Sequence, residues 1–417
     1  MSYRPRVLDP VVEEHLQAMG GVLLEGPRGC GKTATGLEHA ASSLRLDASP
    51  RLVELASLDP QSLLAGETPR LIDEWQLAPA LWNHARHEID DRQAPGQFLF
   101  SGSASPPPDP SRHSGAGRIS RLRLHTMSLA ETGLSSGAVS LESLHQGQSK
   151  VSGASDVTYE RLAEQAVRGG WPGLLESSQQ AAARFNRSYV QDVSSAAITA
   201  PEGTRHDPVR LRRLLSALAR NVSGQATLRS LAADVGGSEP SISPDTVRSY
   251  MDSLTRTFCL DELPAWGVKL RSRSRLRTPA KLHFCDPALA VAALGVDARR
   301  LAHDPEFFGH VFESMVVHDL RVYAQAHDAQ VFHYRDNTGL EVDAIIDYSW
   351  NDWAAVEVKL GWSQTEAAER NLLALRDERV DTDVAGKPAF LAVVTGAEYA
   401  YTLPSGVHVI PLTLLGP

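Results

Sequence analysis

The octapeptide GPRGCGKT, from Gly26 to Thr33, is the feature that most constrains how this chain can fold. It matches the pattern G-x-x-x-x-G-K-[ST], follows the apolar run GVLLE and precedes a helix-length segment, which is the context expected of a phosphate-binding loop. Its glycines let the backbone curl so that N–H groups face an anion. Lys32 would then reach the β- and γ-phosphates of a nucleotide, and the Thr33 hydroxyl would bind Mg²⁺. The alternative is a degenerate loop that has lost its ligand.

The segment RLIDEWQ adds the acidic residues that a nucleotide site needs. An apolar strand ending in Asp73 and Glu74 would put the first carboxylate near Mg²⁺ and the second where it can orient and deprotonate a water molecule. An acidic strand end in solvent is the simpler interpretation of this pair alone. Downstream, FLFSGSAS ends in the hydroxyls of Ser101 and Ser103, which could position the same water. The predicted nucleotide-binding residues are Gly26, Pro27, Arg28, Gly29, Cys30, Gly31, Lys32, Thr33 and Asp73.

Residues 22–124 alternate short apolar runs with helix-length segments, which predicts an α/β fold with crossover helices. With 417 residues, the chain is long enough for two to four domains. We place an ATPase domain at 1–131, a Ser/Gly-rich linker or exposed insertion at 132–158, a helical domain at 159–282 and an α/β domain at 283–417.

The order of these motifs resembles the AAA+ ATPases. More closely, it resembles a bacterial and archaeal family of ATP-binding proteins with a C-terminal domain of unknown function 4143. The segments that carry this likeness are HSGAGRIS, GGWP at Gly169–Pro172, and KLHFCD at Lys281–Asp286, which has His283 where the family has an aromatic residue. The resemblance implies assembly as a homo-oligomer in which an arginine of one subunit faces the γ-phosphate of the next. It suggests Arg118 as this catalytic arginine, with Arg121 and Arg123 as competitors and an ordinary surface ion pair as the alternative.

Composition restricts the remaining possibilities. Hydrophobic residues make up 42% and charged residues 22%, as in ordinary globular proteins. The formal net charge of −9 gives no global sign of nucleic-acid binding. No apolar run approaches the ~20 residues of a membrane span, and the N-terminus has no signal-peptide pattern. Three cysteines, far apart in the sequence, fit a reducing compartment. We therefore expect a cytoplasmic protein without a membrane partner.

The middle of the chain is basic. Residues 205–281 hold 14 Lys and Arg against 7 Asp and Glu, a local excess of +7. Within KLRSRSRLRTPAK the cations recur at every second position, so an extended segment would project them from one face. Upstream, TLRSLAADVGGSEPSISPDTVRSYMDSL resembles a winged helix, whose second helix would turn Arg248 and Ser249 outward. These features predict contact with a nucleic acid, DNA being the favoured class, although folding or subunit contact would also use them. The alternating cations are Lys269, Arg271, Arg273, Arg275 and Arg277.

The C-terminal acids suggest a second site. Glu313 lies in the expected amphipathic helix EFFGHVFESMVVHDLRVYAQ, Asp343 ends an extended segment, and Glu357 shares a strand face with Lys359. Such carboxylates can converge on one divalent cation while the amine assists the chemistry. Their order resembles the PD-(D/E)xK restriction-endonuclease-like fold, although no proline precedes Asp343 and Glu341 is an alternative acid.

The resemblance implies nuclease chemistry with Mg²⁺ or Mn²⁺ bound by Glu313, Asp343 and Glu357. The alternative is an ion pair in an inactive fold. The sequence thus predicts an Mg²⁺-dependent ATPase, with Glu74 and Ser101 at its water, that acts on DNA and carries a nuclease-like domain. Competing interpretations are an ATP-gated regulatory or interaction protein and a motor that remodels protein partners.

Overall fold

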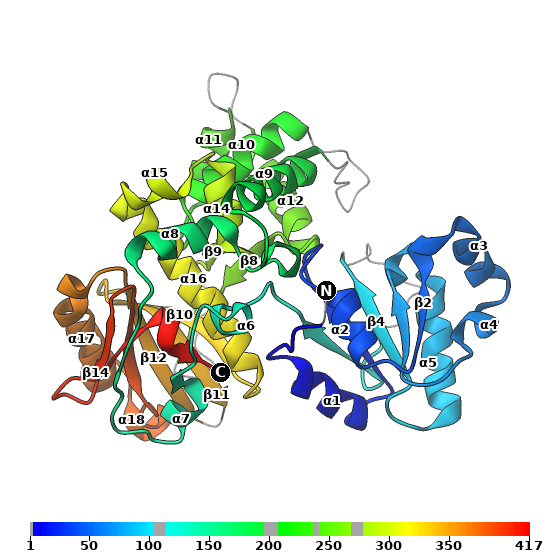
Figure 1. The fold of residues 1–417 in the computed structure, drawn as a ribbon, viewed down its shortest axis with the longest axis horizontal. Helices are drawn as coiled ribbons and strands as arrows, with labels where there is room; N and C mark the ends of the chain where they lie inside the picture. The colour runs from blue at the N-terminus through cyan, green and yellow to red at the C-terminus, as the bar shows by residue number, and fades with distance from the viewer. Residues whose placement is uncertain (1–2, 104–113, 196–206, 237–241, 268–277, 350) are drawn as a thin grey trace.

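The structure is a computed structural model, and the chain folds into three parts that meet around one long helix (Figure 1). The N-terminal part lies at the right in blue and cyan, the helical part above in green, and the C-terminal sheet at the lower left in orange and red. The long helix, in yellow, lies between the helical part and that sheet. The described residues are 3–103, 114–195, 207–236, 242–267, 278–349 and 351–417.

The N-terminal part is built on a five-stranded sheet in the order β2-β3-β4-β1-β5, in which every pairing is parallel. This confirms the α/β sheet predicted for this region. Because β4 separates β1 from β3, the ends of these three strands lie side by side at one edge. The strands are β1 (Gly21–Glu25), β2 (Ser42–Arg45), β3 (Arg70–Asp73), β4 (Phe98–Gly102) and β5 (Ile119–Arg123).

Helices cover this sheet and bury an aromatic core. Trp82 packs against Trp75 with ring centroids 4.7 Å apart and against Phe100 at 5.1 Å. Proline opens two of the helices, and the side chains of Ser49 and Asp59 cap them, which fixes where each begins. The helices are α1 (Asp9–Ala18), α2 (Lys32–Glu38), α3 (Pro50–Leu58), α4 (Pro60–Leu64) and α5 (Ala80–Arg92).

The helical part follows the leucine spacing of the sequence. In α10, Leu211, Leu214, Leu215 and Leu218 are each buried, so the i, i+3, i+4, i+7 pattern faces the core. The helices are α8 (Tyr159–Arg168), α9 (Gln179–Ser195), α10 (Pro208–Arg220), α11 (Leu228–Gly236), α12 (Pro244–Arg256), α14 (Pro287–Ala293) and α15 (Ala298–Ala302).

An antiparallel pair, β8 (Leu260–Leu263) and β9 (Lys281–Phe284), follows α12. The winged-helix prediction rests on the two helices α11 and α12 alone and stays a prediction. The predicted domain boundary after residue 282 falls inside β9. The alternating cations predicted at Lys269, Arg271, Arg273, Arg275 and Arg277 lie outside the described residues.

The C-terminal part is a seven-stranded mixed sheet in the order β10-β11-β12-β13-β15-β14-β7. β11 pairs antiparallel with β10 and β12, whereas β12, β13 and β15 run parallel. Helix α17 (Thr365–Ala374) packs on β12 and β13, and α18 (Thr382–Ala385) follows it. The strands are β10 (Gln330–Arg335), β11 (Glu341–Ser349), β12 (Asp352–Lys359), β13 (Leu391–Thr395), β14 (Tyr399–Thr402) and β15 (His408–Pro411).

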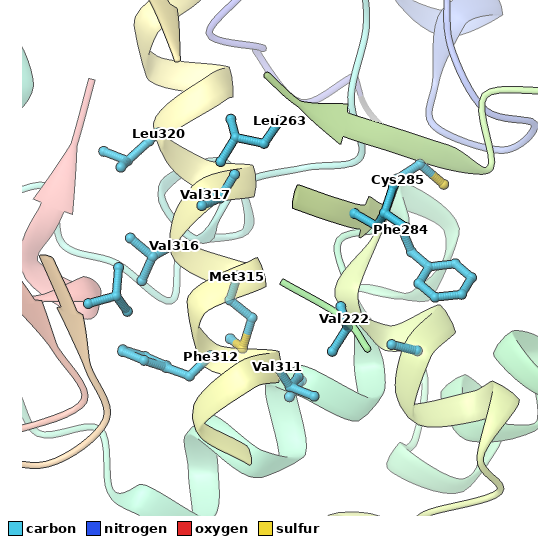
Figure 2. Close-up of a cluster of buried hydrophobic side chains, with 14 of the residues drawn as sticks. Val222, Leu263, Phe284, Cys285, Val311, Phe312, Met315, Val316, Val317 and Leu320 are labelled. Carbon is cyan, nitrogen blue, oxygen red and sulfur yellow. The ribbon is translucent and has the colours of Figure 1, made fainter. Parts of the chain in front are cut away.

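Helix α16 (Pro305–Gln325) joins the helical part to the C-terminal sheet. The sequence predicts an amphipathic helix, but the structure buries it on nearly all sides, because it packs on β10, β11 and β12 and also on α8, α14 and α15. Figure 2 shows this core, where Leu263 of β8 lies near Val317 of α16. A helix buried this way holds its neighbours in fixed relative positions.

The Ser/Gly-rich segment 132–158, predicted to be a linker or exposed insertion, has many exposed residues but also contains regular secondary structure. It forms α7 (Leu141–His145) and two short strands, β6 (Val139–Ser140) and β7 (Gly153–Ala154). β6 pairs with β16 (Leu415–Gly416), and β7 completes the C-terminal sheet beside β14. A few apolar side chains outweigh the polar composition because they are buried in this sheet's core. They are Val139, Leu141, Leu144 and Val151.

Over the described residues, the structure contains no helix that is both apolar enough and long enough to cross a membrane.

Candidate functional site

The phosphate loop joins β1 to α2 at the carboxyl edge of the N-terminal sheet. Gly29 and Gly31 adopt φ values of 85° and 109°, which side chains disfavour, so glycine is required for this turn. A Cβ on Gly26 would lie 2.2 Å from the carbonyl oxygen of Leu124, which excludes any larger residue there. The three glycines therefore give the loop its shape.

Lys32 lies across its own loop. Its Nζ donates hydrogen bonds to the carbonyl oxygens of Gly26 at 2.9 Å and Pro27 at 2.8 Å, and the residue is 6% exposed. Both partners are neutral carbonyls, so the ammonium charge is not neutralised by an acid at these contacts. An anionic phosphate is a stronger partner for the ammonium than either carbonyl.

Three side chains converge beside this lysine. Thr33 Oγ1 lies 3.0 Å from Asp73 Oδ1 and 3.1 Å from its Oδ2, and the Ser101 hydroxyl donates a hydrogen bond to Asp73. They come from α2, β3 and β4. A hydroxyl next to a carboxylate is the kind of oxygen set that Mg²⁺ prefers, so Thr33 and Asp73 fit this ion. Ser101 thus contacts the predicted metal ligand rather than standing free.

Glu74 follows directly after Asp73 with a φ of 55°, an uncommon conformation for a residue with a side chain. Its carboxylate accepts a hydrogen bond from the Gln76 amide. Such strained positions concentrate at functional sites, because the surrounding fold must enforce them. The turn separates Glu74 from the strand direction and leaves its side chain half-buried at the edge of the sheet.

Each of the three candidate arginines is in an ion pair within the chain. Arg118 Nε lies 2.9 Å from Asp90, Arg121 Nη1 2.8 Å from Glu25, and Arg123 Nη2 2.7 Å from Asp261. The hydrogen bond from Arg118 holds the pKa of Asp90 below its usual value. The Arg118 side chain stays 45% exposed, so it could also reach another molecule.

A pocket of about 490 Å³ opens next to the phosphate loop. Gly31 and Thr35 line one side, and Pro172 and Leu175 of the GGWP region line another. Tyr3 closes it, with its hydroxyl donating to Asp9 at 2.6 Å. Tyr3 could not be predicted here from sequence, because one tyrosine near the N-terminus carries no pattern.

The GGWP turn lies between the phosphate loop and β9. The Gly170 N–H donates to Asp286 Oδ2 at 2.8 Å, and the Gly170 carbonyl accepts from the Met127 N–H at 2.7 Å. Trp171 is buried, and a Cβ on Gly29 would meet its ring at 3.7 Å. The turn thus connects the phosphate loop with the residue that follows β9.

The predicted C-terminal acids also converge. Glu313 comes from α16, Asp343 from β11 and Glu357 from β12. Lys359 Nζ lies 2.6 Å from Glu357 Oε2 and 3.4 Å from Asp343 Oδ2, and that same Asp343 oxygen accepts the Val358 N–H at 2.9 Å. The order E…D…E-x-K therefore brings its residues into one cluster.

A second lysine, which the sequence analysis did not include, lies inside this cluster. Lys281 Nζ is 2.7 Å from Glu313 Oε1, 2.7 Å from Glu341 Oε1 and 3.3 Å from Asp343 Oδ1. KLHFCD was noted only as a family likeness. Its alternation could have indicated a strand, but no spacing relates Lys281 to acids that follow it in the chain by 32 residues or more.

Burial sets the protonation of the cluster. Burial, with a contribution from the nearby Asp343, raises the pKa of Glu313 to about 7 and that of Glu357 to about 8, although the lysines act in the opposite direction. Burial alone would also raise the pKa of Asp343, but Lys281 and Lys359 hold it below its usual value. The cluster is therefore close to neutral near pH 7.

The acids do not fit a divalent metal ion in this arrangement, because ammonium groups already contact both oxygens of Asp343 and one oxygen each of Glu313 and Glu357. Within the part of the chain that the structure describes, no group of three or more His, Cys, Asp or Glu side chains is arranged to hold a metal ion.

In the helical part, Arg248 of α12 is exposed and Ser249 is half-buried.

Comparisons with known proteins agree with these three parts. Residues 20–133 match a family model described as an AAA domain, and residues 159–300 and 308–415 match domains of unknown function 8612 and 4143. The N-terminal part is therefore an AAA-type P-loop domain.

Two curated relatives are uncharacterized proteins, Rv2008c of Mycobacterium tuberculosis and Mb2031c of Mycobacterium bovis. Each is 25% identical over 404 residues, covering 94% of this chain and 79% of the relative. Among solved structures, the Walker-type ATPase PABY2304 of Pyrococcus abyssi is 13% identical with a TM-score of 0.44, covering 70% of this chain and 99% of its own.

Proposed function

We propose that the chain is an Mg²⁺-dependent ATPase whose nucleotide state is transmitted to the C-terminal part. The observation that carries this is the convergence of Thr33, Asp73 and Ser101 next to Lys32, at one edge of a parallel sheet. Lys32 would leave the carbonyls of its loop for the β- and γ-phosphates. Thr33 and Asp73 would hold Mg²⁺, which when bound neutralises charge on the phosphates.

Hydrolysis also needs a positioned water molecule. Glu74 would orient and deprotonate it, and the hydrogen bond from Gln76 would hold its carboxylate in place. Ser101 would keep Asp73 aligned for the metal. The pocket closed by Tyr3 is large enough for the nucleoside, which would then lie between the phosphate loop and the GGWP region.

A path for transmission starts from the end of β5. Thr126 Oγ1 lies 2.9 Å from His318 Nε2, and the Leu129 N–H donates to Asp319 Oδ2 at 2.9 Å. Burial alone would lower the pKa of His318, but its bond to Asp319 raises it above the usual value. These buried bonds fix the chain that leaves the ATPase domain onto α16, which also carries Glu313.

The test of the ATPase is Glu74→Gln. Turnover should fall by about 100-fold or more, because the water loses its base, while nucleotide affinity stays within a few-fold. Glu67→Gln is a matched control at an exposed glutamate upstream of β3, and it should turn over at the wild-type rate. Steady-state phosphate release and calorimetric titration give the two quantities. Equal turnover in the Glu74→Gln variant and the wild type would rule out this role.

A nucleic acid, DNA before RNA, is the proposed partner of the helical part. The support is the excess of 14 basic over 7 acidic residues in 205–281 and the exposed Arg248. Anisotropy with labelled duplex DNA should show binding that weakens steeply as salt rises. A lack of binding at low salt would favour the alternative, an ATP-gated regulatory or interaction protein, and turnover stimulated only by a protein would favour a remodelling motor.

A homo-oligomer with Arg118 reaching the neighbouring nucleotide is the proposed assembly. The support is the resemblance to AAA+ ATPases together with the exposure of Arg118. Mixing Arg118→Ala with Glu74→Gln subunits should restore turnover at interfaces that receive an intact arginine and an intact Glu74. Two inactive variants that stay inactive when mixed would remove Arg118 from this role.

Metal-dependent cleavage of DNA by a restriction-endonuclease-like C-terminal domain is the second candidate function. The convergence of Glu313, Asp343 and Glu357 with Lys359 favours it, whereas Lys281 opposes it. Incubation of supercoiled plasmid with Mg²⁺ or Mn²⁺, with and without ATP, tests it. Cleavage that is lost in Asp343→Ala while ATP turnover survives would establish this function.

A further inference from the structure

Lys281 has no part in the function proposed above, although it is at the centre of the C-terminal acids. Its side chain is 3% exposed, and its Nζ contacts carboxylate oxygens of Glu313, Glu341 and Asp343 at 2.7, 2.7 and 3.3 Å. These three acids come from α16 and β11, whereas Lys281 comes from β9. One ammonium group thus joins three carboxylates from two other elements.

We infer that the Lys281 ammonium group occupies the position where a divalent metal ion would bind. The C-terminal site therefore excludes Mg²⁺ and Mn²⁺, and the same contacts hold β9 in its position. This goes beyond ATP hydrolysis and does not depend on it. It also means that the C-terminal part is not a nuclease that is ready to bind a metal ion.

The carboxylate oxygen atoms of the cluster already accept hydrogen bonds from the protein. Asp343 gives Oδ1 to Lys281 and Oδ2 to Lys359 and the Val358 N–H. Glu357 gives Oε2 to Lys359 and Oε1 to the Asn371 amide at 3.1 Å. A metal ion bound at about 2.1 Å from these oxygens would have to displace hydrogen bonds already made to charged donors.

The positive charge of Lys281 also opposes the binding of a metal ion. An ion beside Glu313, Glu341 and Asp343 would lie next to an ammonium group that is removed from water, and two buried like charges at this range repel strongly. Two lysines also supply the positive charge that a metal ion would otherwise bring to the four acids. The site is therefore satisfied without an added cation.

The strand carrying the ammonium is held from both sides. β9 pairs with β8 along its length, with Lys281 opposite Leu263. On its other side, the Ser223 N–H donates to the Leu282 carbonyl at 2.9 Å, and the Leu282 N–H donates to the Gly224 carbonyl at 3.0 Å. Lys281 thus projects from a fixed backbone and cannot leave the acids by a loop movement alone.

The test measures Mn²⁺ binding to the full-length, nucleotide-free protein. Binding is monitored as the loss of the free Mn²⁺ signal in electron paramagnetic resonance. All variants carry Asp73→Asn, so that the N-terminal site does not contribute. The parent should bind no Mn²⁺ at sub-millimolar concentration. Lys281→Met should gain one Mn²⁺ per chain, and its thermal midpoint should rise with Mn²⁺. Adding Asp343→Asn should abolish both gains.

Lys359→Met is the matched control, because it removes an ammonium group from the same Asp343 but leaves Lys281 in place. It should gain no Mn²⁺, and an equal gain there would overturn the inference by showing that any lost positive charge is enough. Lys281→Met/Glu341→Gln keeps the local charge balanced and replaces the single variant if that does not fold. Mn²⁺ binding by the parent that Asp343→Asn removes, or no gain in either folded Lys281 variant, would also overturn it.

Discussion

Lys32 and Lys281 are both buried, and each lies within its own site, but their partners differ. Lys32 donates to two backbone carbonyls of the phosphate loop, whereas Lys281 is surrounded by three carboxylates. Among the described residues the first ammonium has no acidic partner, so an incoming phosphate can neutralise its charge. The second is already neutralised by the protein. A lysine can therefore keep one site ready for an anion and close another to a cation.

The largest expected effect is at the anion site. Lys32→Met should lower ATP turnover by about 100-fold or more, because the methionine cannot bind the phosphates. Lys150→Met, at an exposed lysine, is the control and should leave turnover unchanged. Phosphate release and calorimetric nucleotide titration measure both. Wild-type turnover in Lys32→Met would show that the Lys32 ammonium group does not bind the phosphates of the nucleotide.

The next effect concerns pH and Glu357, which contacts Lys359 in the same acidic cluster as Lys281. Glu357 has a pKa of about 8 in the folded protein against an ordinary 4.5, so between these values the folded state holds a proton that the unfolded state releases. Stability should therefore fall as pH rises, by at most about 1.4 kcal/mol per pH unit for this one proton. Glu357→Gln should remove that part of the slope.

Thermal midpoints from pH 5 to 8.5 measure this effect. The wild type should lose stability relative to Glu357→Gln as pH rises, while Glu313, with a pKa of about 7, leaves some slope in both proteins. A difference between wild type and variant that is the same at every pH would show that Glu357 does not titrate in this window.

A smaller effect should come from the turn between the two sites. A Cβ on Gly170 would lie 2.0 Å from the Met127 carbonyl oxygen, so Gly170→Ala should destabilise the protein by about 1–3 kcal/mol. Gly173→Ala, three residues later, meets nothing within 4 Å and should change stability little. Denaturant titration compares them, and equal stabilities would contradict the close packing of this turn.

The smallest effect should come from the ion pair at the anion site. Arg45 Nε lies 3.8 Å from Asp73 Oδ2, but its side chain is 56% exposed. Solvent screens such a pair, so Arg45→Ala should change the free energy of unfolding by less than about 1 kcal/mol. A loss of several kcal/mol in denaturant titration would mean that exposure does not distinguish this pair from the buried Lys281 cluster.

The parts that could be predicted from sequence are those specified by local pattern. The phosphate loop has a contiguous motif, and the alternation of apolar runs and helices indicated a parallel sheet. Together they placed Thr33, Asp73 and Ser101 at the ends of neighbouring elements. The order E…D…E-x-K predicted that three acids on neighbouring elements would meet, and the structure does bring them together. They are Glu313, Asp343 and Glu357.

The missed features all depend on long-range contacts. Lys281 reaches acids on α16 and β11 because β9 crosses beside them, and no periodicity encodes that crossing. Tyr3 reaches the pocket only through the packing of the N-terminal segment. The polar composition of 132–158 suggested a linker or exposed insertion, although four buried apolar side chains attach the segment to the C-terminal part while many of its polar residues stay exposed. The boundary expected after residue 282 divides β9, a strand that lies between Pro279 and the Asp286-Pro287 pair.

The pairing of β6 with β16 has a consequence for how the protein is made. Val139 pairs with Leu415, which lies 276 residues later in the chain, while the sheet of the phosphate loop closes with β5 at Arg123. On the ribosome the first sheet needs no residue beyond Arg123. The segment at Val139 must wait until Leu415 has been translated, with its apolar side chains open to chaperones during that interval.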